Sequence, residues 1–190
     1  MSMKTVVFIG TSLVVRLAGD MGIHPEIPSD LDLPGIRVEF IGLPGGHVAE
    51  VRSLQDQVTS YHPDLIIIQV GGNDLSKTRI NYTNVESSIT RLANDWSNIS
   101  KVVIMELFPR IKGRYYTASQ GLYYNSQVNM VNSHLRRNNI AGFINIRVWK
   151  HRGFKNPTIP VMSSDGVHFN SRGQYKYYKS LRGAIVEGLK

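Results

Sequence analysis

The chain has 190 residues, 42% of them hydrophobic and 19% charged, which suffices for one hydrophobic core, so we expect a single domain over residues 1–190. It contains no cysteine, and this excludes disulfide frameworks, thiolate metal sites and cysteine nucleophiles. The net charge of +8 favours anionic partners such as nucleic acid or an acidic membrane, without identifying one.

Short apolar or β-branched runs along the chain predict five β-strands. These runs are Val6–Ile9, Ile36–Ile41, Leu65–Val70, Val102–Met105 and Gly142–Ile146. The first run is too short for a signal-peptide core and far too short for a membrane span. On this ground we expect an intracellular, cytoplasmic protein.

Between the strands, apolar residues recur at the spacing of helices that bury one face. Three such stripes are Val51, Leu54, Val58 and Tyr61; Val85, Ile89, Leu92, Ala93 and Trp96; and Tyr124, Val128, Val131 and Leu135. A last helix is predicted to follow the capping residue Ser171. Its apolar face would hold Tyr175, Tyr178, Leu181, Ile185 and Leu189.

Strands and helices thus alternate, and the strands are apolar throughout, which predicts a parallel sheet covered on both faces. The expected fold class is α/β, a three-layer α/β/α sandwich with a five-stranded parallel sheet. Ligands of such sheets bind beyond the carboxyl ends of the strands. Two long polar segments, Phe108–Gly121 and Arg147–Ser164, are predicted to be loops, and we expect them to wall the site.

The first two strands are followed by candidate functional residues. Gly10–Ser12 follows the first strand, and Ser12 would start a helix, a position that suits a nucleophile but also a simple cap. After the second strand, Gly45 and Gly46 either present a backbone N–H to a ligand or make a turn. His47 is expected to be a loop or helix-start residue rather than a catalyst.

Two further candidates lie after the third strand and near the C-terminus. In Gly71–Asp74, the Asn73 amide can donate a hydrogen bond to a developing oxyanion, or simply form part of a turn. Asp165 and His168 precede the last predicted helix. A loop can fold so that the aspartate orients one ring nitrogen while the other nitrogen faces a serine hydroxyl. With Ser12 this would make a triad in the chain order Ser, Asp, His.

Four of these segments resemble, in their order and spacing, the sequence blocks of the SGNH hydrolase superfamily, also called GDSL esterases and lipases. The segments are Gly10–Ser12, Gly45, Gly71–Asp74 and Asp165–His168. The resemblance spans almost the whole chain. It implies a flavodoxin-like fold and a serine esterase that hydrolyses acyl or acetyl esters through an acyl-enzyme. The implied substrate is a small acyl ester or a lipid, and no cofactor or metal is implied.

The resemblance also implies roles for individual residues. Ser12 would be the nucleophile, His168 its base and Asp165 the residue that orients the base. The oxyanion hole would consist of the Ser12 and Gly45 backbone N–H groups and the Asn73 side chain.

The chain departs from the family pattern at Thr11, where an aspartate usually stands between the glycine and the serine. Because Thr11 lies outside the triad, we expect altered support around the nucleophile rather than lost catalysis. Gly46 lies beside Gly45 and could fill its place in the oxyanion hole. Further segments are similar to SGNH-type domains of animal retrotransposon proteins, namely Leu107–Arg110, Trp149–Phe154 and Gln174–Tyr178.

An alternative from another class is a non-catalytic SGNH-fold module that binds nucleic acid or an acidic membrane. Cations interleaved with aromatic residues can track phosphates and stack on bases. Such segments contain Arg110, Lys112, Arg114, Tyr115 and Tyr116; Arg147, Trp149, Lys150, Arg152, Phe154 and Lys155; and Arg172, Lys176, Lys179 and Arg182.

A second alternative keeps the esterase but changes its substrate from an acyl or lipid ester to an acetylated sugar. Aromatic residues of the two predicted loops suit either substrate, and these are Tyr115, Tyr116, Trp149 and Phe154. A metal-dependent hydrolase is disfavoured, because the six histidines lack the close spacing of a zinc-binding helix.

Overall fold

The computed structural model describes residues 3–76, 81–140, 145–152, 154 and 160–190. Its strands are β1 (Lys4–Gly10), β2 (Ile36–Gly42), β3 (Leu65–Gln69), β4 (Lys101–Met105) and β5 (Ile146–Trp149). Its helices are α1 (Ser12–Asp20), α2 (Val48–Arg52), α3 (Gln55–Ser60), α4 (Tyr82–Ser97), α5 (Ala118–Ile140) and α6 (Ser171–Gly188). A short 3-10 helix, η1 (Asp74–Ser76), follows β3.

The strands form one parallel sheet in the order β2-β1-β3-β4-β5. At its centre, the apolar residues of Val6–Ile9 in β1 and 65–68 in β3 are completely buried, as expected for strands covered on both faces. The register aligns Gly10 with both Gly42 and Gln69, so the carboxyl ends of β1, β2 and β3 meet at one edge. The predicted five-stranded parallel sheet is confirmed.

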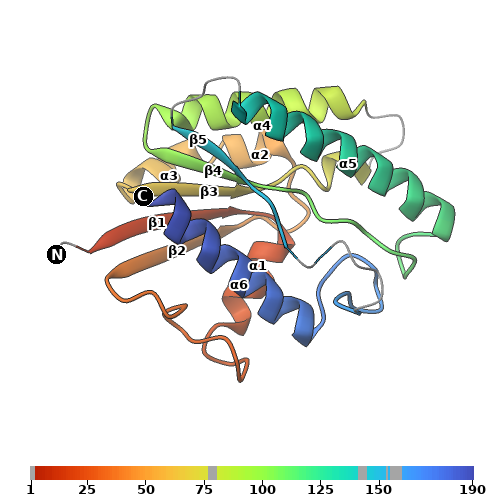
Figure 1. The fold of residues 1–190 in the computed structure, drawn as a ribbon, viewed down its shortest axis with the longest axis horizontal. Helices are drawn as coiled ribbons and strands as arrows, with labels where there is room; N and C mark the ends of the chain where they lie inside the picture. Colours follow the sequence, from red (N-terminus) through yellow and green to blue (C-terminus); the bar gives the residue numbers. More distant parts are fainter. Residues whose placement is uncertain (1–2, 77–80, 141–144, 153, 155–159) are drawn as a thin grey trace.

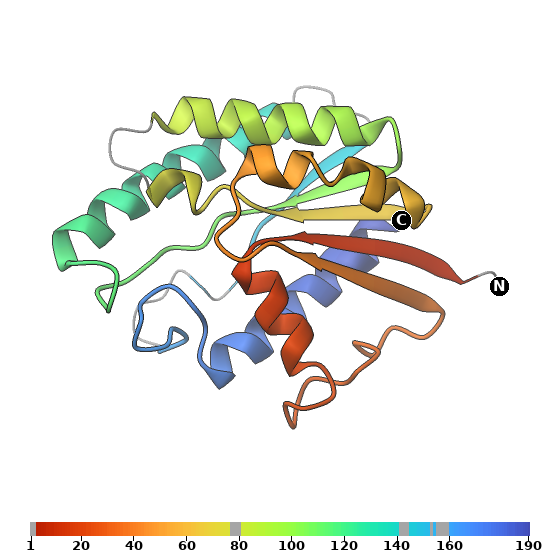
Figure 2. The same cartoon turned by 180° about the vertical axis from the view of Figure 1, so that it is seen from behind.

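Helices cover both faces of the sheet (Figure 1, Figure 2). α1 and α6 lie on one face, and α2, α3, α4 and α5 lie on the other. Successive residues of β1 point to opposite faces. Val6 and Phe8 pack in the core beneath α1 and α6, whereas Val7 and Ile9 pack in the core beneath α4 and α5. The predicted three-layer α/β/α sandwich is therefore confirmed.

α4 and α5 bury the apolar stripes that their spacing predicts. Residues at most 4% exposed are Val85, Ile89, Leu92, Ala93, Trp96, Tyr124, Val128, Val131 and Leu135. The predicted stripe from Val51 to Tyr61 does not lie on one helix, because the chain turns at Ser53 and Leu54 between α2 and α3. No helix in the described part of the chain is long and apolar enough to cross a membrane.

The fifth strand lies later than predicted. β5 runs from Ile146 to Trp149, whereas the apolar run predicts Gly142–Ile146, of which residues 142–144 lie outside the described part. β5 is an edge strand, and its Arg147 pairs with Glu187 of α6 at 2.9 Å. Edge strands commonly carry charged residues. Because β5 contains the charged Arg147, the apolar run before it predicts this strand too early.

The last helix also begins differently from the prediction. Asn170, rather than Ser171, is the cap of α6, because its side chain accepts a hydrogen bond from the Gly173 N–H at 2.9 Å. Ser171 is the first helical residue, and its hydroxyl lies 2.7 Å from His24 Nε2. Asparagine and serine are both good caps, so residue type alone could not separate these neighbours. Tyr177 is completely buried beside the predicted apolar face.

His151 is a titratable side chain buried beneath α6. Its ring stacks on Phe108 with the centroids 3.9 Å apart, and its Nδ1 lies 2.7 Å from the Ser180 hydroxyl. Burial lowers the pKa of His151 to about 3, and a hydrogen bond with the Glu106 backbone offsets this only in part. In the unfolded chain a histidine titrates near ~6.5. The fold therefore loses stability as the pH falls from about 6.5 towards 3, because only the unfolded chain gains the proton.

Lowering the pH from about 7.5 to about 5 should reduce the free energy of unfolding by about 2 kcal/mol through His151 alone. His151→Phe should lose most of this acid sensitivity. The control is His62→Asn, because His62 is exposed and asparagine tolerates its backbone φ of +47°. This variant should keep the acid sensitivity of the wild type. Urea unfolding at both pH values measures the difference. A wild-type pH dependence in His151→Phe would contradict a neutral buried imidazole.

Candidate active site

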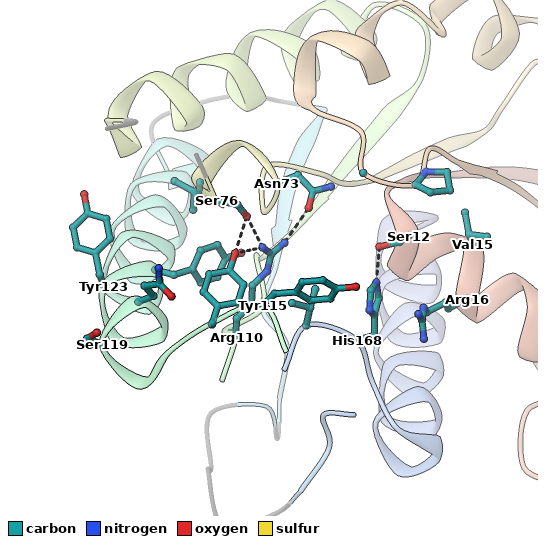
Figure 3. Close-up of a pocket in the computed structure, with 17 residues that line it drawn as sticks. Ser12, Val15, Arg16, Asn73, Ser76, Arg110, Tyr115, Ser119, Tyr123 and His168 are labelled. Carbon is teal, nitrogen blue, oxygen red and sulfur yellow. Dashed lines mark hydrogen bonds between the residues drawn. The ribbon is translucent and has the colours of Figure 1, made fainter. Parts of the chain in front are cut away.

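Ser12, His168 and Asp165 form a hydrogen-bonded chain at the carboxyl edge of the sheet, and Figure 3 shows its contact between Ser12 and His168. Ser12 is the first residue of α1, directly after β1, and the other two lie in the loop that leads into α6. Ser12 Oγ lies 2.9 Å from His168 Nε2, and His168 Nδ1 lies 2.6 Å from Asp165 Oδ2. The fold thus brings together three candidate residues from opposite ends of the chain.

Several donors hold the Asp165 carboxylate. Its Oδ1 accepts hydrogen bonds from the Ser163 hydroxyl at 2.8 Å and from the Val167 and His168 backbone N–H groups at 2.8 and 2.9 Å. Partial burial alone would raise the pKa of Asp165, but the hydrogen bonds from His168, Val167 and Ser163 hold it well below its usual range. The carboxylate therefore stays ionised and favours the imidazole tautomer with its proton on Nδ1.

The loop that carries Asp165 and His168 is packed against the segment before α5. Gly166 has a φ of +76°, and a Cβ at this position would lie 2.3 Å from the Ile111 carbonyl oxygen. The Ile111 N–H donates in turn to the Gly166 carbonyl at 3.0 Å. Only glycine fits this left-handed and crowded position. The glycine between the two candidate residues therefore sets the path of their loop.

Ser12 lies at a helix N-terminus, where the backbone N–H groups point out of the helix and favour an anion. Thr11 precedes it in the N-cap position and is only 8% exposed. The Thr11 carbonyl accepts a hydrogen bond from the Val14 N–H at 3.0 Å, while its side chain makes no cap hydrogen bond. The turn that presents the serine is thus held through the backbone at the position where the family pattern has aspartate.

The Asn73 side chain lines the same cleft as Ser12. Its Nδ2 donates to the Gly46 carbonyl at 3.1 Å, and its Oδ1 accepts from Arg110 Nη2 at 3.0 Å. An amide nitrogen carries two hydrogens, so this arrangement leaves Asn73 a second N–H for a ligand.

The two neighbouring glycines differ in their surroundings. The Gly46 N–H donates to the Leu43 carbonyl at 2.9 Å, which uses this donor within the turn. Gly45 lines the cleft together with Ser12 and has a φ of +73°, a conformation that glycine adopts readily. Of the two, Gly45 is the better candidate for a backbone donor to a ligand.

His47 lies at the N-cap of α2, as the helix-start prediction has it. Its Nδ1 lies 3.6 Å from the Asp74 carboxylate, which also accepts a hydrogen bond from the Val48 N–H at 3.3 Å. Sequence spacing did not reveal this acidic neighbour, because the two residues follow different strands. Asp74 therefore anchors the start of α2 to the end of β3.

A cleft of about 960 Å³ opens beside Ser12 and His168. Its tyrosine wall consists of Tyr115, Tyr116, Tyr123 and Tyr124. Arg16 and Arg110 also line the cleft, and Figure 3 shows them on opposite sides of the Ser12–His168 pair. Burial raises the pKa of Tyr124 to about 12, although Arg110 lowers it. The cleft thus combines neutral aromatic surface with two cations.

The two predicted loops contribute unequally to this cleft. The first supplies Tyr115 and Tyr116, although it is shorter than predicted because α5 begins at Ala118. In the second, Phe154 is 7% exposed and packs in the core beneath α6, while the Trp149 ring donates to the Ser180 hydroxyl at 2.9 Å. Neither Trp149 nor Phe154 lines the cleft beside Ser12, so the prediction that they offer substrate surface is wrong for this cleft.

The same burial weakens the nucleic-acid interpretation of the second basic segment. Phe154 packs against Phe108 and Phe169 with ring centroids 4.7 and 5.2 Å apart, so its faces are not available to stack on bases. Lys155 of that segment lies outside the described residues.

Sequence reasoning missed several residues of the cleft, among them Arg16, Tyr123 and Arg110. Tyr123 directly precedes a buried residue of the α5 stripe, and nothing in the helical spacing marks it as part of a site. Arg110 was grouped with the basic segment, whereas its guanidinium contacts Asn73. The available signal was the position of Arg110 directly after Pro109 in the segment that follows a strand. This signal did not identify Asn73 as the contact of Arg110.

A family model described as GDSL-like Lipase/Acylhydrolase matches residues 8–181. The chain belongs to this family. This GDSL hydrolase is accordingly a carboxylic ester hydrolase, and the resemblance to SGNH hydrolases inferred from its sequence blocks is confirmed.

Solved structures share the fold of this GDSL hydrolase. A GDSL-like lipase from Bacteroides thetaiotaomicron has a TM-score of 0.68 and 18% identity, covering 98% of this chain and 88% of that chain. A lipase/acylhydrolase from Enterococcus faecalis has a TM-score of 0.68 and 19% identity, covering 99% and 98%. An acetyl xylan esterase has a TM-score of 0.70 and 17% identity, covering 95% and 99%. Among curated protein sequences, none matches this chain.

Proposed function

We propose that this GDSL hydrolase cleaves esters through Ser12, His168 and Asp165 and an acyl-enzyme intermediate. The observation that supports this mechanism is the continuous chain of contacts, 2.9 Å from Ser12 Oγ to His168 Nε2 and 2.6 Å from His168 Nδ1 to Asp165 Oδ2. Ser12 Oγ attacks the acyl carbonyl while His168 Nε2 takes its proton, and Asp165 stabilises the resulting imidazolium. His168 then protonates the leaving alcohol, and water repeats the sequence to release the acid.

The negative charge that develops on the carbonyl oxygen requires donors on one side of Ser12. We assign this role to the backbone N–H groups of Ser12 and Gly45 and to the second N–H of Asn73. The positive end of the α1 dipole acts in the same direction. Three donors of this kind, fixed before the reaction, need no reorganisation when the charge appears.

The composition of the cleft favours an ester with an apolar acyl group. The tyrosine wall offers aromatic surface against which an acyl chain can pack, although a sugar ring can stack on it as well. Arg16 is exposed at the rim and would attract an anionic alcohol portion. We therefore propose small or medium acyl esters and esters of acidic lipids as the substrate class, with acetylated sugars as the competing class.

Turnover of p-nitrophenyl esters from acetate to octanoate tests the proposed activity, with acetylated xylan as the sugar substrate. The expected result is hydrolysis with an initial burst of p-nitrophenol, because acyl-enzyme accumulates when deacylation is slower than acylation. A correctly folded chain that hydrolyses none of these esters would refute the proposal. Salt-dependent binding to single-stranded nucleic acid or to acidic vesicles would then be measured for the non-catalytic alternative.

Asn73→Ala should lower kcat by roughly 10² to 10³-fold, because one donor to the oxyanion is lost while the nucleophile and base remain. KM should change much less, since the donor acts mainly on the transition state. Steady-state kinetics of a p-nitrophenyl ester measure both constants. The matched control is Asn84→Ala at an exposed position of α4, which should retain wild-type kinetics. Full kcat in Asn73→Ala would remove Asn73 from the mechanism.

A further inference from the structure

Arg110 is held in place at both its backbone and its side chain. Its backbone N–H donates to Asn125 Oδ1 of α5, and Asn125 Nδ2 donates back to the Arg110 carbonyl, both at 2.8 Å. The guanidinium carbon lies 4.6 Å from the Tyr124 ring centroid and 5.4 Å from that of Tyr116. Cation–π contacts of this kind favour one position of the cation. Arg110 is therefore a fixed group beside the cleft rather than a mobile surface charge.

The tip of this side chain contacts neutral acceptors. Nη1 donates to the Ser76 and Tyr116 hydroxyls, and Nη2 donates to Asn73 Oδ1 at 3.0 Å. The tyrosine hydroxyl also donates to Ser76 Oγ at 2.9 Å. Figure 3 shows the guanidinium below Asn73, with the amide oxygen turned towards it and the amide nitrogen on the side of Ser12.

These contacts permit only one orientation of the Asn73 amide. In the observed orientation, Oδ1 accepts from Arg110 and Nδ2 donates to the Gly46 carbonyl. If the amide were flipped, its NH₂ group would face the guanidinium and its oxygen would face the Gly46 carbonyl. Both contacts would then be repulsive, donor against donor and acceptor against acceptor. A flipped amide would also turn an oxygen, rather than an N–H, towards the developing oxyanion.

We propose that Arg110 is a positioning residue, which fixes the Asn73 amide so that its free N–H faces the oxyanion. This inference rests on the proposed role of Asn73 as an oxyanion donor. The positive charge of Arg110 also polarises the amide, which makes its N–H a stronger donor.

The glycine before Asn73 is consistent with this role. A Cβ at Gly72 would lie 3.0 Å from the Tyr124 hydroxyl and 3.4 Å from Arg110 Nη2. The bare backbone at this position leaves space for the guanidinium and its tyrosine to approach the end of β3. The Gly71–Asp74 block therefore supplies the amide together with room for the side chain that orients it.

Kinetics of Arg110→Met, Arg110→Lys and the control Arg114→Met test this inference. Arg114 is an exposed cation of the same segment, and its loss should change kcat by less than about twofold. Arg110→Met should lower kcat by about 10- to 100-fold with little change in KM, as part of the Asn73 contribution is lost. Arg110→Lys should recover part of that loss, because one ammonium N–H can still donate to Asn73 Oδ1.

A double-mutant cycle separates positioning from a general structural effect. In an Asn73→Ala background, Arg110→Met should lower kcat by less than about threefold further, because the group that it orients is absent. Losses that multiply fully in the double variant would overturn the proposal. An effect of Arg110→Met on KM alone, or one equal to that of Arg114→Met, would also overturn it.

A measurement that does not depend on turnover completes the test. The Asn73 side-chain amide signals in a nitrogen–proton correlation spectrum should shift in Arg110→Met and stay in place in Arg114→Met, with both variants folded by circular dichroism. Unmoved Asn73 signals in Arg110→Met would overturn the positioning role. Absence of turnover in the wild type would instead refute the proposed esterase mechanism, and the spectra would still decide the role of Arg110.

Discussion

Ser12→Ala is expected to lower kcat by about 10⁶-fold, the scale of loss when the nucleophile of a Ser-His-Asp triad is removed. The reason is that Ser12 Oγ, 2.9 Å from His168 Nε2, is the atom that forms the acyl-enzyme in the proposed mechanism. Residual hydrolysis of about 10³-fold over the uncatalysed rate is expected to remain, because the proposed oxyanion donors and the cleft are intact. Steady-state hydrolysis of a p-nitrophenyl ester measures the loss.

The control for this variant is Ser88→Ala, which removes a hydroxyl that donates to the Asn84 carbonyl within α4. It should keep wild-type kinetics. Thermal unfolding of both variants checks that Ser12→Ala is folded. Substantial activity in a folded Ser12→Ala, on the scale of Ser88→Ala, would mean that another residue is the nucleophile.

Asp165→Asn is expected to lower kcat by about 10⁴-fold near neutral pH, while the size of the side chain is retained. The asparagine oxygen can still accept from the Val167 and His168 backbone N–H groups, as Asp165 Oδ1 does at 2.8 and 2.9 Å. Its NH₂ group would then face His168 Nδ1 and place the ring proton on Nε2. In that tautomer the imidazole cannot accept the Ser12 proton.

The pH dependence of the wild type provides a second readout of the same residue. The proposed mechanism requires a neutral imidazole as the base, so kcat/KM should be lower at acid pH than at neutral pH. Hydrogen bonds hold the pKa of Asp165 well below its usual range. The pH profile of kcat/KM should therefore show no step from this carboxylate above about pH 5. Since its folded pKa is the lower one, Asp165 stabilises the fold above its unfolded pKa and loses this contribution only as the pH falls below that value.

The matched control for Asp165→Asn is Asp95→Asn. In the wild type, the Asp95 carboxylate pairs with Arg52 on the surface. The kinetics and pH profile of Asp95→Asn should equal those of the wild type. If Asp165→Asn retained more than about a tenth of the wild-type kcat, the orienting role of the carboxylate would be contradicted.

Much of the fold could be predicted because its central elements follow simple periodicities. β1 and β3 each contain an uninterrupted apolar run, and α4 and α5 place apolar residues at helical spacing. The bounds of β5 could not be predicted from an apolar run, because β5 is an edge strand in which Arg147 pairs with Glu187 of α6. Residue type could not distinguish Asn170 from Ser171 as the cap of α6, because that choice depends on which side chain reaches the Gly173 N–H.

The candidate site was predictable where its residues follow strand ends in recognisable blocks. Ser12 and Asn73 lie in such blocks, after β1 and β3, and the topology of a parallel sheet directs them to one edge. Asp165 and His168 lie in a recognisable block shortly before α6. The contact between Arg110 and Asn73 was not predictable, because it joins segments 37 residues apart through side chains alone. For the same reason Phe154, similar in type to the tyrosines of the wall, could not be assigned to the core from sequence.

The proposed mechanism is tested most directly by labelling the protein with a fluorophosphonate probe and mapping the modified peptide. The mechanism predicts one adduct, on Ser12, because its contact with His168 would activate this hydroxyl and the proposed oxyanion donors would stabilise the phosphonyl oxygen. Labelling should be abolished in Ser12→Ala and persist in Ser88→Ala. An adduct on another residue, or a folded wild type that remains unlabelled, would contradict Ser12 as the nucleophile.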